Sequence, residues 1–146
     1  MRTDEIRKAL RNTKLFDDVY SVDTLPTRPH GLLVCNLDPS DRPGSHWVAI
    51  YVDSYGSRAE YFDSFGKEPN NTMKSYLDRW SKHWTYNCRQ LQSVVSLLCG
   101  HYCIYFCMLR NSGLTMCEIV STFSTDTAFN DIHVHAFVCR RLLTNK

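Results

Sequence analysis

Three cysteines, Cys99, Cys103 and Cys107, recur every four residues in the apolar stretch between Ser96 and Leu109. On a helix, each step of four residues turns by about 40°, so the three thiols would form one slowly turning stripe. Disulfide bonds between such positions have poor geometry. Three roles are left to separate: metal ligand, core side chain and nucleophile.

A structural zinc ion usually needs four ligands from cysteine and histidine. The side chains that could complete a set with the three cysteines are Cys88, His101, His133, His135 and Cys139. His133 and His135 would lie about 200° apart on a helix and could not both face one ion. We therefore predict no metal site, and we expect Cys103 and Cys107 to be small core residues, since free cysteine is often buried.

Cys99 differs from the other two because it stands where the helix should begin, directly before Gly100. Unpaired N–H groups and the macrodipole at a helix N-terminus stabilise a thiolate and lower the pKa of a cysteine there. Cys99 is therefore the candidate nucleophile, and such a thiol needs a nearby base.

The candidate base is His46, and the candidate group that orients it is Asp63. The segments HWVAIYV and AEYFDSF flank the polar loop DSYGS and should form an antiparallel hairpin. If the hairpin turns at Ser54–Tyr55, His46 lies directly across from Asp63, where an imidazole N–H can meet a carboxylate. Without a thiol in need of a base, the simpler interpretation is an exposed strand-start histidine and a turn-forming aspartate.

A side-chain amide could stabilise the oxyanion of acyl transfer together with the backbone N–H of Cys99. The candidate is Gln92, seven residues before Cys99, on an expected strand over residues 87–95 that leads toward the nucleophile. Gln90 is the competing choice, because the two glutamines differ in strand parity but not enough in distance to exclude either.

The chain resembles the adenovirus protease (adenain) family in the order of its motifs, which are His46-Trp47, Asp63 in YFDSFG, Gln92, and Cys99 in CGHYC. The pattern looks most similar to the relatives carried by Polinton/Maverick elements and adintovirus-like viruses, and the broader clan includes the SUMO-specific proteases. The resemblance implies a papain-like α+β fold with the catalytic order His–Asp–Cys. It also implies that His46 is the general base, Asp63 orients it, Cys99 is the nucleophile and Gln92 helps to form the oxyanion hole.

The function implied by the resemblance is an intracellular cysteine endopeptidase that cleaves viral capsid or core precursors, in the host nucleus or the virion. Within the same clan, the alternative is a protease that acts on ubiquitin or SUMO-like modifiers. An alternative from another class is a non-catalytic zinc-binding or structural module. The sequence requires no cofactor, but adenoviral relatives are stimulated by a capsid-derived peptide and by DNA, so both activators stay open. The net charge of +2 argues only weakly against DNA dependence.

Two further residues are candidates for substrate binding: Trp47, which follows the base, and Gly100, which follows the nucleophile. The Trp47 ring could roof a narrow approach to Cys99 and favour glycine beside the scissile bond, because glycine has no Cβ. Proteases of the resembled families cut beside glycine. The competing interpretation is that Trp47 is a large core residue.

The helices and strands expected around these residues indicate one α+β cysteine protease domain over residues 1–146. With 43% hydrophobic residues, the chain is long enough to bury a core. We find neither a signal-peptide core nor an apolar run of membrane-spanning length, and the odd count of seven cysteines favours reduced thiols inside a cell. Helices are expected over residues 3–12, behind Asn70–Asn71, over 99–110 ending near Gly113, and from Asn130–Asp131. Strands are expected over residues 31–37, 46–53, 58–66 and 87–95, with a mixed sheet packed on the central helix that begins at Cys99.

Overall fold

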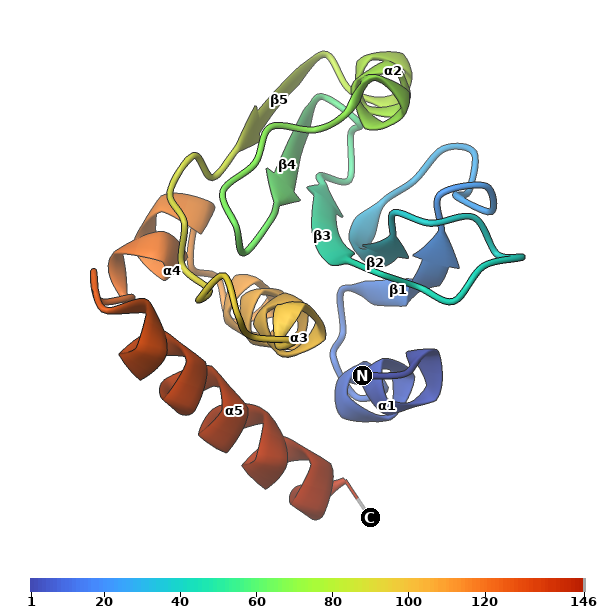
Figure 1. Ribbon diagram of the computed structural model, residues 1–146. Coiled ribbons are helices and arrows are strands. Elements are labelled where there is room, and N and C mark those ends of the chain that lie inside the picture. The colour runs from blue at the N-terminus through green and yellow to red at the C-terminus, as the bar shows by residue number, and fades with distance from the viewer. Residues whose placement is uncertain (146) are drawn as a thin grey trace.

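The computed structural model describes residues 1–145 and contains one mixed five-stranded sheet in the order β1-β2-β3-β4-β5 (Figure 1). The strands are β1 (Phe16–Ser21), β2 (Gly31–Asn36), β3 (Trp47–Val52), β4 (Arg58–Phe62) and β5 (His83–Tyr86). β2, β3 and β4 pair antiparallel, whereas β1 is parallel to β2 and β5 is parallel to β4. The helices are α1 (Thr3–Leu10), α2 (Asn71–Trp80), α3 (Cys99–Asn111), α4 (Met116–Ser121) and α5 (Thr127–Thr144).

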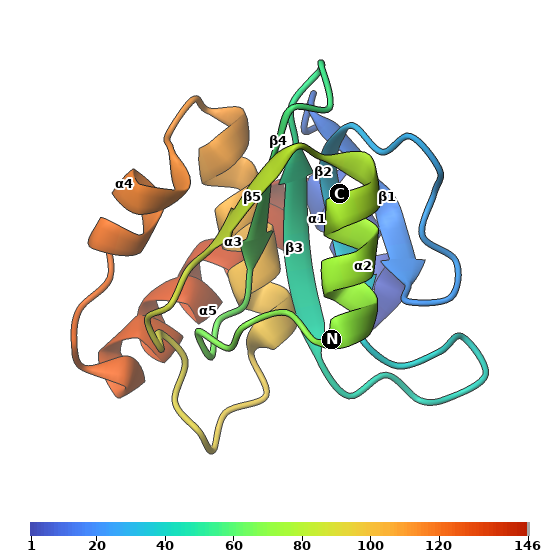
Figure 2. The ribbon, with the colours of Figure 1, turned by 90° about the horizontal axis from the view of Figure 1, so that it is seen from above.

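Each face of the sheet carries its own apolar core. α2 covers one face, where Met73 and Leu77 pack on side chains of β2, β3 and β4. α3 packs on the other face, with α1, α4 and α5 around it. Figure 2 shows α2 on one side of the sheet and α3 with α5 on the other. The α+β class with a mixed sheet on a central helix, as the sequence predicts, is therefore confirmed.

α3 is buried on nearly all sides, which explains why its sequence is apolar without a polar face. Residues 102–107 are all buried, and the Phe106 ring stacks on Phe62 of β4 with 4.6 Å between centroids. The helix ends at Asn111, with Ser112 as its C-cap, and the following Gly113 has a φ of +99° that a residue with a Cβ rarely adopts. The predicted span of this helix is confirmed, so its first residue, Cys99, sits at a rigid helix N-terminus. Among the described residues, no helix combines the length and apolar character needed to cross a membrane.

The β3–β4 hairpin turns one residue later than expected. Ala49 pairs with Phe62 and Val52 with Ala59, so the turn is centred on Tyr55–Gly56, where Gly56 has a φ of +64°. The prediction that His46 lies directly across from Asp63 is therefore wrong by two positions. A shift of two residues leaves a side chain on the same face of a sheet, so the two side chains can still meet.

The predicted strand over residues 87–95 is also wrong. β5 ends at Tyr86, and the following segment is a loop whose Leu91 and Gln92 N–H groups both donate to the carbonyl of Ser64. The apolar residues Val94 and Val95 are exposed, so they supply no buried strand face.

The other differences lie at elements with weak sequence patterns. β1, β5 and α4 are additional to the predicted elements, and α5 begins at Thr127, ahead of Asn130–Asp131. The earlier start follows from Asp126, whose side chain accepts hydrogen bonds from the N–H groups of Ala128 and Phe129. The helix behind Asn70 is confirmed, and its N-cap is the Asn70 side chain, which accepts from the N–H of Met73.

Candidate active site

Cys99 begins α3 and is 9% exposed, so its thiol lies just below the surface. Burial by itself raises the pKa of this thiol. The hydrogen bonds with the His46 side chain and with the backbone N–H groups of Trp47 and Gly100 outweigh burial and hold the pKa of Cys99 below its usual value. These groups all favour the thiolate, which is the nucleophilic form.

The other cysteines of the stripe have the opposite environment. Burial in the apolar core raises the pKa of Cys103 and Cys107 well above the usual value, and it raises the pKa of Cys35 to about 12. All seven cysteines, which lie within the described chain, are free thiols. The prediction that Cys103 and Cys107 are core residues is confirmed, and only Cys99 combines burial with groups that stabilise a thiolate.

His46 lies one residue before β3, and its Nε2 atom is 3.0 Å from Oδ1 of Asp63. Because Nε2 is engaged by Asp63, the other ring nitrogen is the one left for the Cys99 thiol. Burial lowers the pKa of His46, but the hydrogen bonds with Asp63 and Cys99 raise it to about 9. The directions of the two pKa shifts agree, and together they favour an imidazolium–thiolate pair.

Asp63 follows β4 directly, and its side chain is almost fully buried. Its Oδ1 atom also accepts a hydrogen bond from the N–H of Phe65 at 2.8 Å. Asn87 holds the Asp63 peptide from both sides: its Oδ1 accepts from the Asp63 N–H at 2.8 Å, and its Nδ2 donates to the Asp63 carbonyl at 2.6 Å. Sequence spacing could not reveal Asn87, because only the parallel register of β4 and β5 brings residue 87 beside Asp63.

Gln92 is fully buried, and each end of its amide has a partner. The Ser64 hydroxyl donates to Gln92 Oε1 at 2.6 Å, and Gln92 Nε2 donates to both the carbonyl and the hydroxyl of Ser96 at 2.9 Å. Gln90 is exposed, and its amide donates to the Gln92 carbonyl at 3.0 Å. Burial and fixed orientation therefore favour Gln92 over Gln90 as the candidate oxyanion donor.

Trp47 and Gly100 lie against each other beside the nucleophile. A Cβ placed on Gly100 would lie 3.3 Å from Cδ1 of Trp47 and 3.1 Å from Cβ of Met1, which is closer than side chains normally pack. The Trp47 indole N–H donates to the Met1 carbonyl at 3.2 Å, and the ring is 9% exposed within the core around α3. Trp47 thus has a core role and also borders the approach to Cys99.

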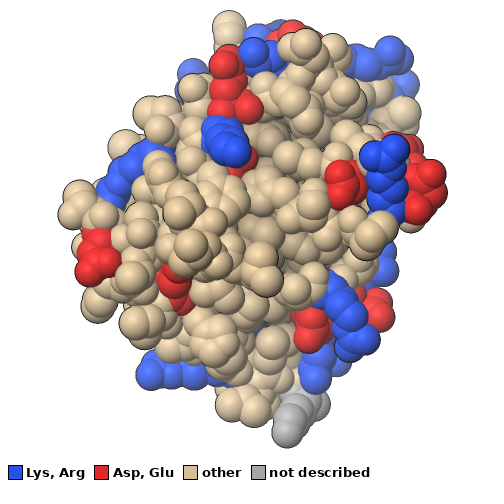
Figure 3. Space-filling model, in the orientation of Figure 1, with Lys and Arg blue, Asp and Glu red and all other residues tan. Residues whose placement is uncertain are grey.

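Two surface hollows of about 360 Å³ adjoin these residues. One includes His46, Asp63 and Phe65 in its lining, and the His46 and Phe65 rings pack with 5.2 Å between centroids. The other borders Trp47 and the loop after β2. Figure 3 shows the face of Figure 1, on which charged side chains lie mainly around the rim and the middle is uncharged. Charged side chains also line both hollows, among them Lys67 and Glu68 beside His46 and Arg42 beside Trp47.

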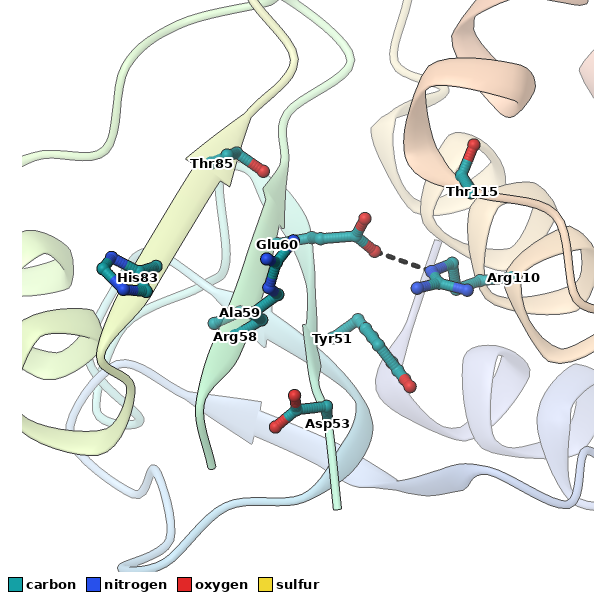
Figure 4. Close-up of a pocket in the computed structure, with 9 residues that line it drawn as sticks. All are labelled: Tyr51, Asp53, Arg58, Ala59, Glu60, His83, Thr85, Arg110 and Thr115. Carbon is teal, nitrogen blue, oxygen red and sulfur yellow. Dashed lines mark hydrogen bonds and ion pairs between the residues drawn. The ribbon is translucent and has the colours of Figure 1, made fainter. Parts of the chain in front are cut away.

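A larger cavity, of about 630 Å³, is lined by residues other than Cys99 and His46 (Figure 4). Its charged groups partly satisfy one another: Arg110 Nε donates to Glu60 at 2.7 Å, and the guanidinium lies 4.2 Å from the centroid of the Tyr51 ring. The lining contains no cysteine and no other strong nucleophile, so we place the chemistry at Cys99.

The zinc alternative has no ligand set in the part of the chain that the structure describes. Over residues 1–145, no group of three His, Cys, Asp or Glu side chains is placed to hold one ion. The His101 and His135 rings stack at 5.5 Å between centroids, whereas His133 contacts the Tyr105 hydroxyl at 3.4 Å. Of the histidines that could have joined the cysteine stripe, His101 and His135 pack on each other and His133 lies apart at Tyr105.

Comparison with known proteins finds viral cysteine proteases among the most similar sequences. The cysteine protease S273R of African swine fever virus (isolate Tick/Malawi/Lil 20-1/1983) is 31% identical over 117 residues, which cover 71% of this chain and 42% of that protein. The same protein from isolate Pig/Kenya/KEN-50/1950, named SUMO-1 cysteine protease S273R, is 30% identical over the same shares. The chain thus spans less than half the length of these relatives. No family model matches the sequence.

Solved structures show the same fold. The crystal structure of the African swine fever virus pS273R protease aligns with a TM-score of 0.62 at 17% identity, covering 92% of this chain and 66% of that one. The SUMO protease Ulp1 aligns with a TM-score of 0.53 at 14% identity, covering 98% of this chain and 75% of that one. The fold is therefore the papain-like α+β fold that these proteases share. The comparisons do not single out the adenovirus or Polinton branch that the sequence motifs resemble.

Proposed function

We propose that this chain is a cysteine protease domain that cleaves after glycine at the C-terminus of a ubiquitin-like modifier, with SUMO-type proteins as the first candidates. The observation that carries the proposal is the set of groups around the thiol: Cys99 at a helix N-terminus, with a lowered pKa caused by His46, which Asp63 holds at 3.0 Å. A buried thiol with a lowered pKa beside an oriented imidazole is the arrangement that nucleophilic catalysis requires.

The residues divide the reaction into two steps. The Cys99 thiolate attacks the scissile carbonyl carbon, and the negative charge that moves to the carbonyl oxygen is stabilised by the Cys99 N–H and by Gln92. The His46 imidazolium gives its proton to the leaving amine, and the C–N bond breaks to leave a thioester. His46 then takes a proton from water, the resulting hydroxide attacks the thioester, and Cys99 leaves as a thiolate.

Two observations support a ubiquitin-like substrate over the capsid precursors that the sequence motifs favour. One of the two relatives and one structural neighbour carry names that specify a SUMO protease. In addition, Trp47 against Gly100 leaves little room for side chains beside Cys99, which suits a chain terminus that ends in glycine. A protease that acts on ubiquitin-like modifiers, the alternative named from the sequence, therefore has better support than a protease that cleaves viral capsid precursors.

Cleavage of viral structural precursors is the second candidate function, because proteins similar to this chain include viral proteases. It would share the adenovirus-type preference for glycine-containing sites, and an activating capsid peptide or DNA would be part of that proposal. A reducing compartment belongs to both candidates, since the Cys99 thiol must stay reduced to react.

The test compares the two substrate classes directly. The purified chain is incubated with SUMO and with ubiquitin, each carrying a C-terminal fluorogenic amide, and with the structural proteins encoded beside its gene. We expect release of the fluorophore from SUMO and none with the Cys99→Ala variant. New N-termini in the structural proteins, with no turnover of either modifier, would instead favour the second candidate.

A further inference from the structure

Ser64 sits between the two halves of the candidate site. It follows Asp63 in the chain, and its hydroxyl donates to Oε1 of Gln92 at 2.6 Å. We propose that Ser64 is a positioning residue that fixes the Gln92 amide so that its N–H groups point toward the nucleophile loop. This inference rests on the proposed protease function and on Gln92 as the oxyanion donor.

The contacts determine which end of the Gln92 amide faces which way. The carbonyl oxygen of Ser96, 2.9 Å from the amide, can only accept a hydrogen bond, so the atom that faces it must be the nitrogen. The other end is then the oxygen, and a distance of 2.6 Å fits a hydroxyl donating to an oxygen. The Ser96 carbonyl therefore specifies the orientation of the amide, and the Ser64 contact is consistent with it.

Burial makes the Ser64 contact important for that orientation. Ser64 is 1% exposed and Gln92 is fully buried, so water cannot replace the Ser64 hydroxyl as a donor to Oε1. Ser64 also accepts, through its carbonyl, the N–H groups of Leu91 and Gln92 at 2.9 and 3.0 Å. One residue thus holds both the backbone and the side chain of Gln92. The Asp63–Ser64 dipeptide links the general base, through Asp63, to the oxyanion donor, through Ser64.

The Ser96 contacts show how the amide can serve a substrate. Ser96 lies three residues before Cys99, and both Gln92 N–H groups point at it in the free protein. The contact with the Ser96 carbonyl is fixed by the backbone, whereas the Ser96 hydroxyl can turn away by rotation about χ1 because this side chain is half-buried. The Gln92 N–H that donates to the Ser96 hydroxyl is therefore the one that would donate to the substrate oxygen instead.

A double-mutant cycle tests whether Ser64 acts through Gln92. kcat and KM are measured for the wild type, Ser64→Ala, Gln92→Ala and the double variant, with a glycine-ended fluorogenic substrate that the wild type cleaves. We expect Ser64→Ala to lower kcat about tenfold with KM little changed, and to have an effect of at most about twofold when Gln92 is already alanine. The same loss in both backgrounds, or no loss in the wild type, would overturn the inference.

Two controls separate positioning from folding. Ser81→Ala removes another buried serine hydroxyl, which donates to the Leu77 carbonyl at 2.7 Å, and should leave kcat unchanged. If Ser64→Ala does not fold, Ser64→Cys carries the cycle, because it keeps the size of the side chain but is a weaker donor. The Ser64→Cys change should then give an intermediate kcat in the wild-type background and no additional loss when Gln92 is already alanine.

A readout without turnover distinguishes failure of this inference from failure of the proposed function. In ¹⁵N-labelled protein, we expect the side-chain NH₂ hydrogens of Gln92 to exchange slowly with water in the wild type and at least tenfold faster in Ser64→Ala. Slow exchange in a chain without peptidase activity would overturn the proposed function and retain the positioning. Equal exchange rates in the two proteins would overturn the positioning whatever the activity.

Discussion

Nε2 of His46 lies 3.0 Å from Oδ1 of Asp63, although the two residues are 17 positions apart and neither belongs to a strand. They meet because His46 precedes β3 and Asp63 follows β4, and these two antiparallel strands place both residues at one edge of the sheet. α3 packs on β3, so its first residue, Cys99, comes to the same edge. The packing of β3, β4 and α3 therefore brings the thiol, the base and the carboxylate close together.

The pKa shifts predict selective labelling of Cys99. The pKa of Cys99 is lowered, so its thiolate persists at pH values where an ordinary thiol is protonated, and limiting iodoacetamide near pH 6 should modify Cys99 first. Peptide mapping by mass spectrometry gives the order. Cys88 and Cys117 are exposed and serve as internal comparisons, and buried Cys103 should be unreactive. Labelling of Cys88 or Cys117 ahead of Cys99 would contradict the assignment.

The raised pKa of His46 predicts that kcat declines at alkaline pH. The pKa of His46 is raised to about 9, so the imidazolium that protonates the leaving amine is present below that pH and lost above it. We expect kcat for an amide substrate to decline as the pH rises through about 9, while the rate of Cys99 alkylation does not decline. A parallel decline of both rates would point to unfolding, which circular dichroism at each pH would detect.

Substitutions should separate the roles of the three groups. Cys99→Ala and His46→Ala should each abolish cleavage and leave the unfolding temperature close to that of the wild type. Asp63→Asn should reduce kcat less, because an amide oxygen can still hold the imidazole ring. Gln92→Ala should lower kcat by about 100- to 1000-fold. If Gln92→Ala is silent and Gln90→Ala is not, the oxyanion donor is Gln90.

Asn87→Ala should weaken the fold and the site together. The variant leaves both the N–H and the carbonyl of Asp63 without their side-chain partner in a buried place, which costs about 1–3 kcal/mol for each unsatisfied group. Urea denaturation measures the loss of stability, and kcat measured below the unfolding transition shows the displacement of Asp63. Asn145 also donates to backbone carbonyls, those of Lys8 and Ala9, but far from this site, so Asn145→Ala is the matched control.

Much of the fold follows from local sequence patterns, and the site follows from the order of its residues. The helix from Cys99 and the β3–β4 hairpin have strong apolar patterns, so their positions could be predicted. The hairpin register could not, because a glycine with positive φ at Gly56 decides the turn. The roles of Ser64 and Asn87 depend on contacts across the sheet and the loop, which no spacing along the chain encodes.

The substrate slot should depend on Trp47 and Gly100. Gly100→Ala places a methyl group 3.3 Å from Trp47 and 3.1 Å from Met1, so we expect a lower kcat with the helix retained. Trp47→Ala should relax the preference for glycine as well as slow the enzyme. A library of peptides with glycine, alanine or leucine before the scissile bond gives the preference. Loss of folding alone in Trp47→Ala would show that its role is confined to the core.

Covalent capture tests the central claim most directly, because it requires both the nucleophile and the substrate class. SUMO carrying a C-terminal vinyl sulfone is incubated with the chain, and the adduct is located by intact mass and peptide mapping. The account predicts one adduct, on Cys99, that forms faster than with a vinyl sulfone on a short unrelated peptide and is absent from His46→Ala. An adduct on another cysteine, or no adduct on a protein whose Cys99 still reacts with iodoacetamide, would contradict it.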